Sequence, residues 1–378
     1  MTLSKKIFLT STIALIVLLL FWGIYNLSFK RPALPTQTTS QQSKQADVSA
    51  VQNAPEVSAI SDEAVLAPTL SSDSQHIEYY SKKTGETYEI NFDGTGKQTV
   101  STEELPGLSY AIWSPDDSKV IRAFPQGSYT KFVFHDYAAG DDIALGNGID
   151  WIAWLNNNKI IYKYYDQGTK ENSLNISNPD GSNWLKITDL KYSSMSLAPI
   201  PKTGLVSFWN SPDANTATDF ESISALGGDA TPLIQNYFGA DYLWSPDGTN
   251  ILMSHTDQQG GNKITLAVTD SQGNNYKDLG VATFVSKCAW SVDDKTVYCA
   301  VPDSLPDDAT LPNDYSDGKI TTSDSFWKIN TETGDKTIIA GPNQLGGKFD
   351  ASNLFLNLNE SSLFFINNLD GKLYKIDL

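Results

Sequence analysis

Residues 241–255 read DYLWSPDGTNILMSH, and close copies of this segment are AIWSPDDSKVIRAF at 111–124 and CAWSVDDKTVYCAV at 288–301. In each copy, two short runs of β-branched and aromatic residues flank a turn of the type Ser-Pro-Asp or Ser-Val-Asp. Proline presets φ at the first turn position, and aspartate can hydrogen-bond its own backbone. The segment therefore predicts two antiparallel strands joined by a tight turn.

The same segment recurs in looser form at residues 68–80, 152–165, 195–209 and 353–367. The positions aligned with Ser114 are 71, 114, 155, 198, 245, 291 and 357, with steps of 41–47 residues and a last step of 66. A period of about 40–45 residues is typical of the four-stranded blade of a β-propeller. The repeats predict seven blades; because the copies at 155, 198 and 357 depart from the pattern, six or eight blades stay open.

The remaining sequence supports an all-β fold. Beyond residue 29 no segment keeps apolar residues at helical spacing, and turn signals recur at short intervals. The repeated tryptophans (Trp113, Trp154, Trp244 and Trp290) are expected to pack between adjacent blades. The last repeat holds only three strands, so we expect residues 57–66 to supply the fourth and close the propeller, because an unpaired edge strand invites aggregation.

These repeats resemble the WD40-like (PD40) repeats of TolB-type propellers and of the propeller domains of dipeptidyl-peptidase relatives. The resemblance rests on Trp-Ser-Pro-Asp-Asp at 113–117, Trp-Ser-Pro-Asp-Gly at 244–248 and Trp-Ser-Val-Asp-Asp at 290–294, and extends over residues 67–378. It implies blade architecture and is nearly silent on function.

The N-terminal region has a different character. Residues 7–29 form an uncharged apolar run, which at about 1.5 Å per residue is long enough to cross a ~30 Å hydrocarbon layer. The run is longer than the apolar part of a signal peptide and lacks a small-x-small cleavage site, which favours an uncleaved anchor. We expect a cytoplasmic N-terminus (residues 1–6), a transmembrane helix (7–29), a flexible stalk (30–56) and an extracytoplasmic propeller (57–378).

Composition excludes several classes of partner. The formal net charge is −17, so the chain repels nucleic-acid phosphates and anionic lipid headgroups, and contact with a membrane is expected through the N-terminal helix alone. Arg122 is the only arginine beyond residue 31, which excludes sites that need an arginine cluster.

The only two cysteines, Cys288 and Cys299, flank a hairpin whose turn is expected at Asp293-Asp294. In that register the two residues face each other directly, which predicts a disulfide in an oxidising compartment. Two buried thiols are the alternative.

Enzymatic signatures are scarce. There is no G-x-S-x-G motif, and the three histidines (His76, His135 and His255) fall in different blades, so we predict neither a metal site nor a cofactor. A carboxylate pair for glycosidase chemistry stays open among 44 acidic residues, but no spacing selects one.

The long last step contains an acidic insertion, VPDSLPDDATLPNDYSDGKITTSD at residues 301–324, between the second and third strands of one blade. Such loops share one face of a propeller with the connections between blades, and that face commonly binds ligands. We expect a binding loop for a cation or a basic peptide, the alternative being a tolerated surface insertion. The predicted binding residues are Asp303, Asp307, Asp308, Asp314, Tyr315 and Asp317.

Taken together, the sequence predicts a membrane-anchored, non-catalytic propeller of a bacterial-type cell envelope that binds or scaffolds a protein or a cell-wall component. The alternative is an extracytoplasmic lyase or glycosidase with its site at the mouth of the propeller channel.

Overall fold

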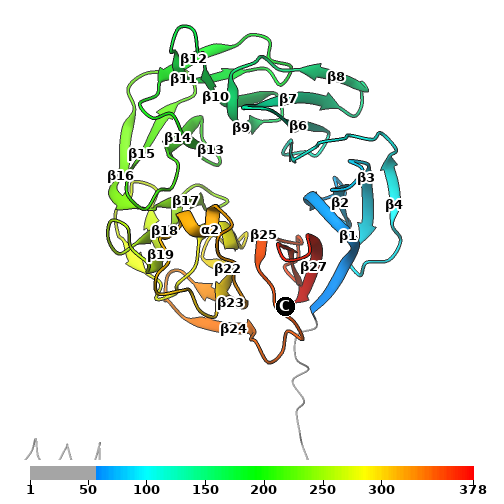
Figure 1. The fold of residues 1–378 in the computed structure, drawn as a ribbon, viewed down its shortest axis with the longest axis vertical. Helices are drawn as coiled ribbons and strands as arrows, with labels where there is room; N and C mark the ends of the chain where they lie inside the picture. Colours follow the sequence, from blue (N-terminus) through cyan, green and yellow to red (C-terminus); the bar gives the residue numbers. More distant parts are fainter. Residues whose placement is uncertain (1–56) are drawn as a thin grey trace, which may run out of the picture. The chain divides into compact units, whose positions relative to one another are not determined.

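The computed structural model describes residues 57–378, which form a ring of antiparallel β-sheets (Figure 1). Five sheets have four strands each, and the sixth has seven. The described residues contain two short helical segments, η1 (Val285–Lys287) and α2 (Asn313–Ser316). The predicted all-β propeller architecture is confirmed.

The seven-stranded sheet has the order β25-β26-β27-β1-β2-β3-β4, and the other sheets each hold four strands that are consecutive in the chain. The bounds in the seven-stranded sheet are β1 (Val57–Leu70), β2 (His76–Ser81), β3 (Thr87–Asn91), β4 (Gln98–Ser101), β25 (Ala351–Leu356), β26 (Ser362–Asn367) and β27 (Lys372–Asp377). The next two sheets hold β5 (Tyr110–Trp113), β6 (Lys119–Gln126), β7 (Tyr129–Asp136), β8 (Asp141–Ala144), β9 (Ile149–Asn156), β10 (Lys159–Tyr165), β11 (Asn172–Ser177) and β12 (Leu185–Asp189). The last three hold β13 (Met195–Pro199), β14 (Leu205–Asn210), β15 (Ala217–Ser224), β16 (Thr231–Phe238), β17 (Asp241–Trp244), β18 (Asn250–Thr256), β19 (Ile264–Asp270), β20 (Lys277–Asp278), β21 (Cys288–Trp290), β22 (Thr296–Pro302), β23 (Asp324–Asn330) and β24 (Lys336–Ala340).

Strand β1 joins the two ends of the ring. Its first residues pair with β27, with Ser58 opposite Lys375, and its last residues pair with β2, with Leu70 opposite Ile77. The backbone N–H of Leu373 donates to Ser61 Oγ at 2.9 Å near the point where the pairing changes partner. Residues 57–66 thus belong to a strand that pairs with both β27 and β2 and continues to Leu70.

The repeated turns have one hydrogen-bonding scheme. Ser114 Oγ donates to Asp116 Oδ1 at 2.7 Å and accepts from the backbone N–H of Lys119 at 3.0 Å. The corresponding bonds around Ser245 have the same lengths. The fourth turn position has positive φ in these turns, and at Gly248 a Cβ would lie 2.5 Å from the carbonyl oxygen of Pro201. Glycine is therefore required there, because two turns of adjacent blades touch.

The repeated tryptophans connect neighbouring blades, as predicted. Trp113, Trp154 and Trp290 each donate an indole N–H to a backbone carbonyl of the preceding inner strand, over 2.8–3.2 Å. Trp244 donates to Ser207 Oγ of the preceding blade at 2.9 Å. Buried clusters also join neighbouring sheets: Ile121 of β6 and Trp154 of β9 belong to the same one. The core of the molecule is therefore a series of interfaces between blades.

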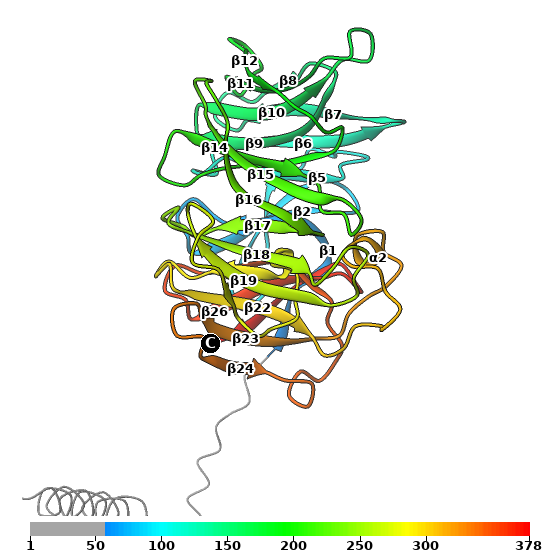
Figure 2. The ribbon, with the colours of Figure 1, turned by 90° about the vertical axis from the view of Figure 1, so that its left-hand side faces the viewer.

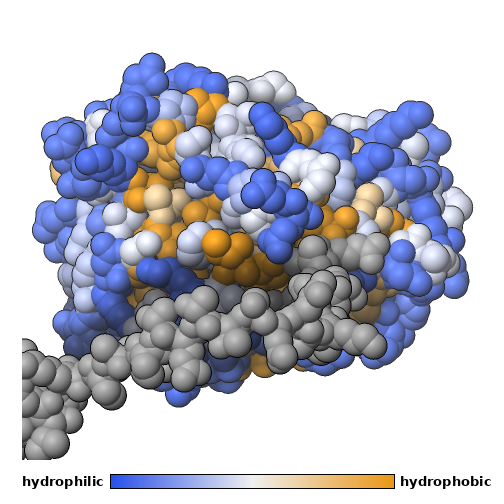
Figure 3. All heavy atoms as spheres, turned by 90° about the horizontal axis from the view of Figure 1, so that it is seen from below, coloured by the Kyte–Doolittle hydropathy of each residue, from blue (hydrophilic) through white to orange (hydrophobic). Residues whose placement is uncertain are grey.

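The alternation of antiparallel strands gives the ring two faces. The Ser-Pro-Asp turns lie on one face, and the β6–β7 turn and α2 project from the other (Figure 2). We call the second face, which carries the turns between second and third strands and the connections between blades, the loop face. The side of the ring where β24 lies carries hydrophilic residues along its rim with hydrophobic residues between them (Figure 3).

The predicted N-terminal segments lie outside the described residues: the cytoplasmic end (1–6), the transmembrane helix (7–29) and the stalk (30–56). Among residues 57–378, no helix has the length and apolar character that a membrane span requires.

Candidate binding face

The acidic insertion lies on the loop face between β22 and β23 and is bonded to neighbouring blades. The backbone N–H of Leu311 donates to the carbonyl oxygen of Gly261 at 3.0 Å. Asn313 of α2 donates through Nδ2 to Asp213 Oδ2 at 2.8 Å and accepts at Oδ1 from the backbone N–H of Ala214 at 2.7 Å. The loops around 210–218 and 256–262 thus contact the insertion and hold it in place.

The insertion also has a small apolar core. Ala309 and Leu311 are buried in a cluster with Ile264 of β19 and Phe284, and Tyr315 packs against it. The Tyr315 ring stacks on Phe284 with centroids 4.6 Å apart and planes at 11°. Burial of this apolar surface stabilises the ordered path of the segment. The insertion is therefore a folded part of the propeller.

Tyr315 covers a buried charged cluster, which consists of Lys287, Asp324 and Asp350. Lys287 is fully buried, and its Nζ donates to Asp324 Oδ2 at 2.8 Å and to Asp350 Oδ1 at 2.7 Å. Tyr315 Oη donates to the same Asp350 oxygen at 2.8 Å. Burial and the bond to Asp350 raise the pKa of Tyr315, so the phenol stays protonated.

The two carboxyls of this cluster differ. Burial raises the pKa of Asp324 more than the charge of Lys287 lowers it, and Asp324 Oδ1 has no partner among the described residues. Burial also acts on Asp350, but the bonds from Lys287, Tyr315 and Thr322 outweigh it and lower the pKa of Asp350. The cluster ties η1, β23 and the start of β25 together, so its role is to hold two blades and the insertion in register.

Two of the predicted binding carboxylates, Asp314 and Asp317, pair with the same lysine of the insertion. Asp314 accepts from the backbone N–H of Thr310 at 2.7 Å and from Lys319 Nζ at 3.0 Å, and that backbone bond and the lysine lower the pKa of Asp314. Asp317 pairs with the same Lys319 at 3.0 Å. Both carboxylates are therefore engaged within the insertion.

Asp303 and Asp307 lie together in a cleft between the insertion and β19–β20. The cleft has a volume of about 500 Å³ and is also lined by Asp278 and by the apolar side chains of Ile264 and Leu305. We call it the acidic cleft; Lys263 is the only basic residue among its described lining residues. Asp308 is exposed and does not line it.

Cys288 and Cys299 form a disulfide across the β21–β22 pair, with an S–S distance of 2.12 Å and the two residues directly opposite each other. Both side chains are buried. The bond covalently joins the two inner strands of the blade that carries the insertion.

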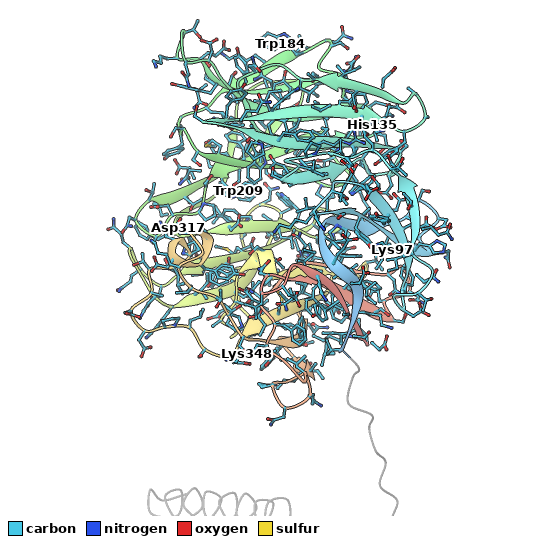
Figure 4. All side chains as sticks on the ribbon, turned by 45° about the vertical axis from the view of Figure 1, so that its right-hand side comes forward. Lys97, His135, Trp184, Trp209, Asp317 and Lys348 are labelled. Carbon is cyan, nitrogen blue, oxygen red and sulfur yellow. A yellow bond between two sulfur atoms is a disulfide. The ribbon has the colours of Figure 1, made fainter. Side chains whose placement is uncertain are left out.

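The three histidines have separate partners in different blades; Figure 4 labels His135. His76 Nδ1 lies 3.5 Å from Asp73 Oδ1. His255 Nε2 shares a hydrogen bond of 2.8 Å with Tyr276 Oη, and His135 Nδ1 shares one of 2.8 Å with Asp142 Oδ1. Among residues 57–378, the single group with metal-ligating potential is Glu103, His135 and Asp142, whose donor atoms lie within 4.8 Å.

A guanidinium bonds to two members of that group. Arg122 Nη1 donates to Glu103 Oε2 at 3.0 Å and to Asp142 Oδ1 at 3.2 Å. Because the positive charge of Arg122 would repel a cation and already compensates the two carboxylates, this group is better explained as an ion-pair network.

Lys287, Asp324 and Asp350 are the residues that sequence reasoning missed. Asp324 follows Lys287 by 37 residues and Asp350 follows it by 63, and none of the three belongs to a motif. The one signal was position, because all three come directly before or at the start of a strand on the loop face.

Comparison with solved structures shows the fold alone. Oligogalacturonate lyase from Vibrio parahaemolyticus is similar with a TM-score of 0.62 and 9% identity, over 86% of this chain and 94% of that one. The Cps50 (Swd1) propeller domain of Myceliophteria thermophila has a TM-score of 0.55 and 8% identity, over 85% and 100% of the two chains. TolB from Acinetobacter baumannii has a TM-score of 0.47 and 12% identity, over 74% and 64%.

No family model matches the chain, and no curated protein matches it in sequence. The solved structures with TM-scores above 0.5 and the strand topology agree on the fold: the described part of the chain is a β-propeller.

Proposed function

We propose that this chain is a non-catalytic, membrane-anchored propeller that binds a basic segment of a protein partner in the acidic cleft. The observation that carries the proposal is the convergence of Asp278, Asp303 and Asp307 around one opening of about 500 Å³. Carboxylates beside apolar walls suit a peptide that carries lysine or arginine together with aliphatic side chains.

The wall of the cleft is held before a ligand arrives. The insertion is bonded to the loops at Asp213 and Gly261, and Asn262 donates to the carbonyl oxygen of Asp307. Asp303 accepts from Ser323 Oγ at 3.2 Å and from Ser325 Oγ. A preformed site loses less conformational entropy on binding, which favours affinity for a short segment.

The surrounding charge supports the same partner class. A chain with net charge −17 attracts cationic partners over distance and repels anionic ones, and this steering weakens as salt increases.

Two further parts of the proposal concern the architecture. We count the seven-stranded sheet as two blades that share β1, which makes the propeller seven-bladed. We assign residues 7–29 as the anchor and residues 30–56 as the stalk that carries the propeller outside the cytoplasm. Fractionation of the full chain and protease protection of its propeller test the anchor and its orientation.

The alternative function is a lyase or glycosidase, and the solved oligogalacturonate lyase structures are what favour it. They share 11% and 9% identity with this chain, and the described histidines bond separately in different blades. We therefore expect no product when the full chain is incubated with oligogalacturonate or neutral polysaccharides; release of unsaturated or reducing ends would favour the enzyme.

The test of binding uses the full chain in lipid nanodiscs and an octalysine peptide, with octaglutamate as the charge control. We expect octalysine to bind and its affinity to fall at least tenfold, about 1.4 kcal/mol, when Asp303→Asn and Asp307→Asn are combined. The matched control is Asp317→Asn, which removes an exposed carboxylate of the same insertion outside the cleft. An equal loss of octalysine affinity in the control variant would contradict the proposal. So would an octalysine affinity that the double substitution leaves unchanged.

A further inference from the structure

A second opening lies between the β5–β8 and β9–β12 blades, away from the insertion, and extends from the loop face toward the face with the Ser-Pro-Asp turns. It consists of two cavities of about 380 and 220 Å³. Both are lined by Asn147, Ile149 and Tyr164, so the two cavities adjoin, and we call them together the tyrosine groove. Together the two volumes fall in the range of ligand sites, about 300–1,000 Å³.

Aromatic rings line the groove from end to end. Tyr129 at the start of β7 is 49% exposed, and Tyr164 and Tyr165 of β10 lie in the same cavity. Trp184 lines the second cavity and is 55% exposed; Figure 4 shows it at the edge of the molecule. Tyr129 in the first cavity and Trp184 in the second are therefore available to a ligand.

A glycine lets the backbone approach these rings. Gly148, in the connection between β8 and β9, has φ of +94°. A Cβ there would lie 2.6 Å from the carbonyl oxygen of Tyr165 and 2.9 Å from the Tyr164 ring. The close contact fixes the tyrosines against the connecting loop.

Hydrogen-bonding groups lie beside the rings. Asp150 is half-exposed and is held by an ion pair with Lys163, a side chain that is 1% exposed. Asp166 accepts from the backbone N–H of Thr169 at 2.7 Å. The first cavity is also lined by the side-chain amides of Asn147 and Gln167.

We propose that the tyrosine groove binds an uncharged saccharide chain. Aromatic faces stack on the C–H faces of sugar rings, while carboxylates and amides take up the hydroxyl groups. The described lining of both cavities includes no lysine or arginine, and its carboxylates repel acidic polysaccharides. A proline-rich peptide also fits aromatic grooves, but polyproline has no N–H donor for the Asp150 carboxylate.

The test uses the full chain in lipid nanodiscs, because common detergents carry sugar headgroups. The probes, at millimolar concentrations in titration calorimetry, are cellohexaose, xylohexaose, mannohexaose and chitohexaose, with oligogalacturonate and decaproline as the other arms. We expect at least one neutral hexasaccharide to bind. Tyr129→Ala, which changes an exposed side chain, is expected to weaken it about tenfold.

Two variants make the result specific. Tyr164→Phe keeps the ring and is expected to change the affinity less than Tyr129→Ala does. Tyr276→Ala removes a tyrosine that is 41% exposed and lines neither cavity, and is expected to leave binding unchanged. The proposal is overturned if no neutral oligosaccharide binds, if oligogalacturonate or decaproline binds in its place, or if Tyr129→Ala has no effect. None of these outcomes bears on octalysine binding in the acidic cleft.

Discussion

At the scale of single residues, Lys287 is a buried charge that joins neighbouring blades beneath the insertion. Its ammonium compensates two buried carboxylates, Asp324 and Asp350, at 2.8 and 2.7 Å. Lys287→Met leaves both uncompensated and is expected to lower the free energy of unfolding by about 3–5 kcal/mol near neutral pH. Urea denaturation measures this, with Lys348→Met, an exposed lysine, as the control. Equal effects of the two substitutions would contradict this account.

Glu78 on β2 makes stability depend on pH. Burial, and then repulsion by Asp117, Glu89 and Asp73, raise its pKa from 4.5 to about 7. The folded state therefore binds this proton more tightly than the unfolded state does. The resulting stabilisation is complete below about pH 4.5 and is lost as pH rises to about 7.

Glu78→Gln is expected to flatten the decline of unfolding free energy between these two pH values, measured by urea denaturation at several pH values. Part of the decline remains, because burial and Asp116 also raise the pKa of Asp117, to about 6. A variant with the same pH profile as the parent chain would show that Glu78 does not titrate in this window.

At the scale of elements, the insertion is held by α2. Asn313→Ala removes the bonds to Asp213 and to the backbone N–H of Ala214, and leaves that N–H without its partner. We expect local stability to fall by about 1–3 kcal/mol. Hydrogen exchange should show faster exchange of amides in residues 303–323 and unchanged exchange in β18; unchanged protection of the insertion would argue that its apolar core alone holds it.

The elements also show what the sequence could predict. The turn around Ser114 and the tryptophan before it are local signals, since serine, aspartate and the strand pair all lie within a few residues. The position and length of the insertion were visible in the same way. The direction of its side chains was not, because Asp314 is turned toward Lys319 by contacts that only the folded loop contains.

The two proposed sites also differ in how much of each the sequence could predict. Two carboxylates of the acidic cleft, Asp303 and Asp307, were predicted as binding residues, whereas Asp278 comes from another blade. The tyrosine groove unites Tyr129, Asn147 and Tyr164 from three segments that have no common motif. Long-range packing creates such sites, and periodicity in one sequence does not reveal it.

At the scale of the whole molecule, β1 closes the ring by pairing with both β27 and β2. Ser58 lies directly opposite Lys375. A disulfide formed by Ser58→Cys and Lys375→Cys would close a very long loop and is expected to raise the free energy of unfolding by about 2–4 kcal/mol. The comparison is between oxidised and reduced forms, with the parent chain under both conditions to account for Cys288–Cys299; no gain on oxidation would mean that the two strand ends separate without unfolding the ring.

We propose that the protein partner docks on the loop face, and not on the face with the Ser-Pro-Asp turns. Site-specific photo-crosslinking in native membranes tests it most directly, with a photoreactive residue at Leu305 in the acidic cleft or at Val292, which is 68% exposed in a turn on the opposite face. We predict that position 305 captures a protein through a lysine- or arginine-rich segment, identified by mass spectrometry, and that Asp303→Asn with Asp307→Asn abolishes the product. Capture of the same protein at position 292 and not at 305 would contradict the claim.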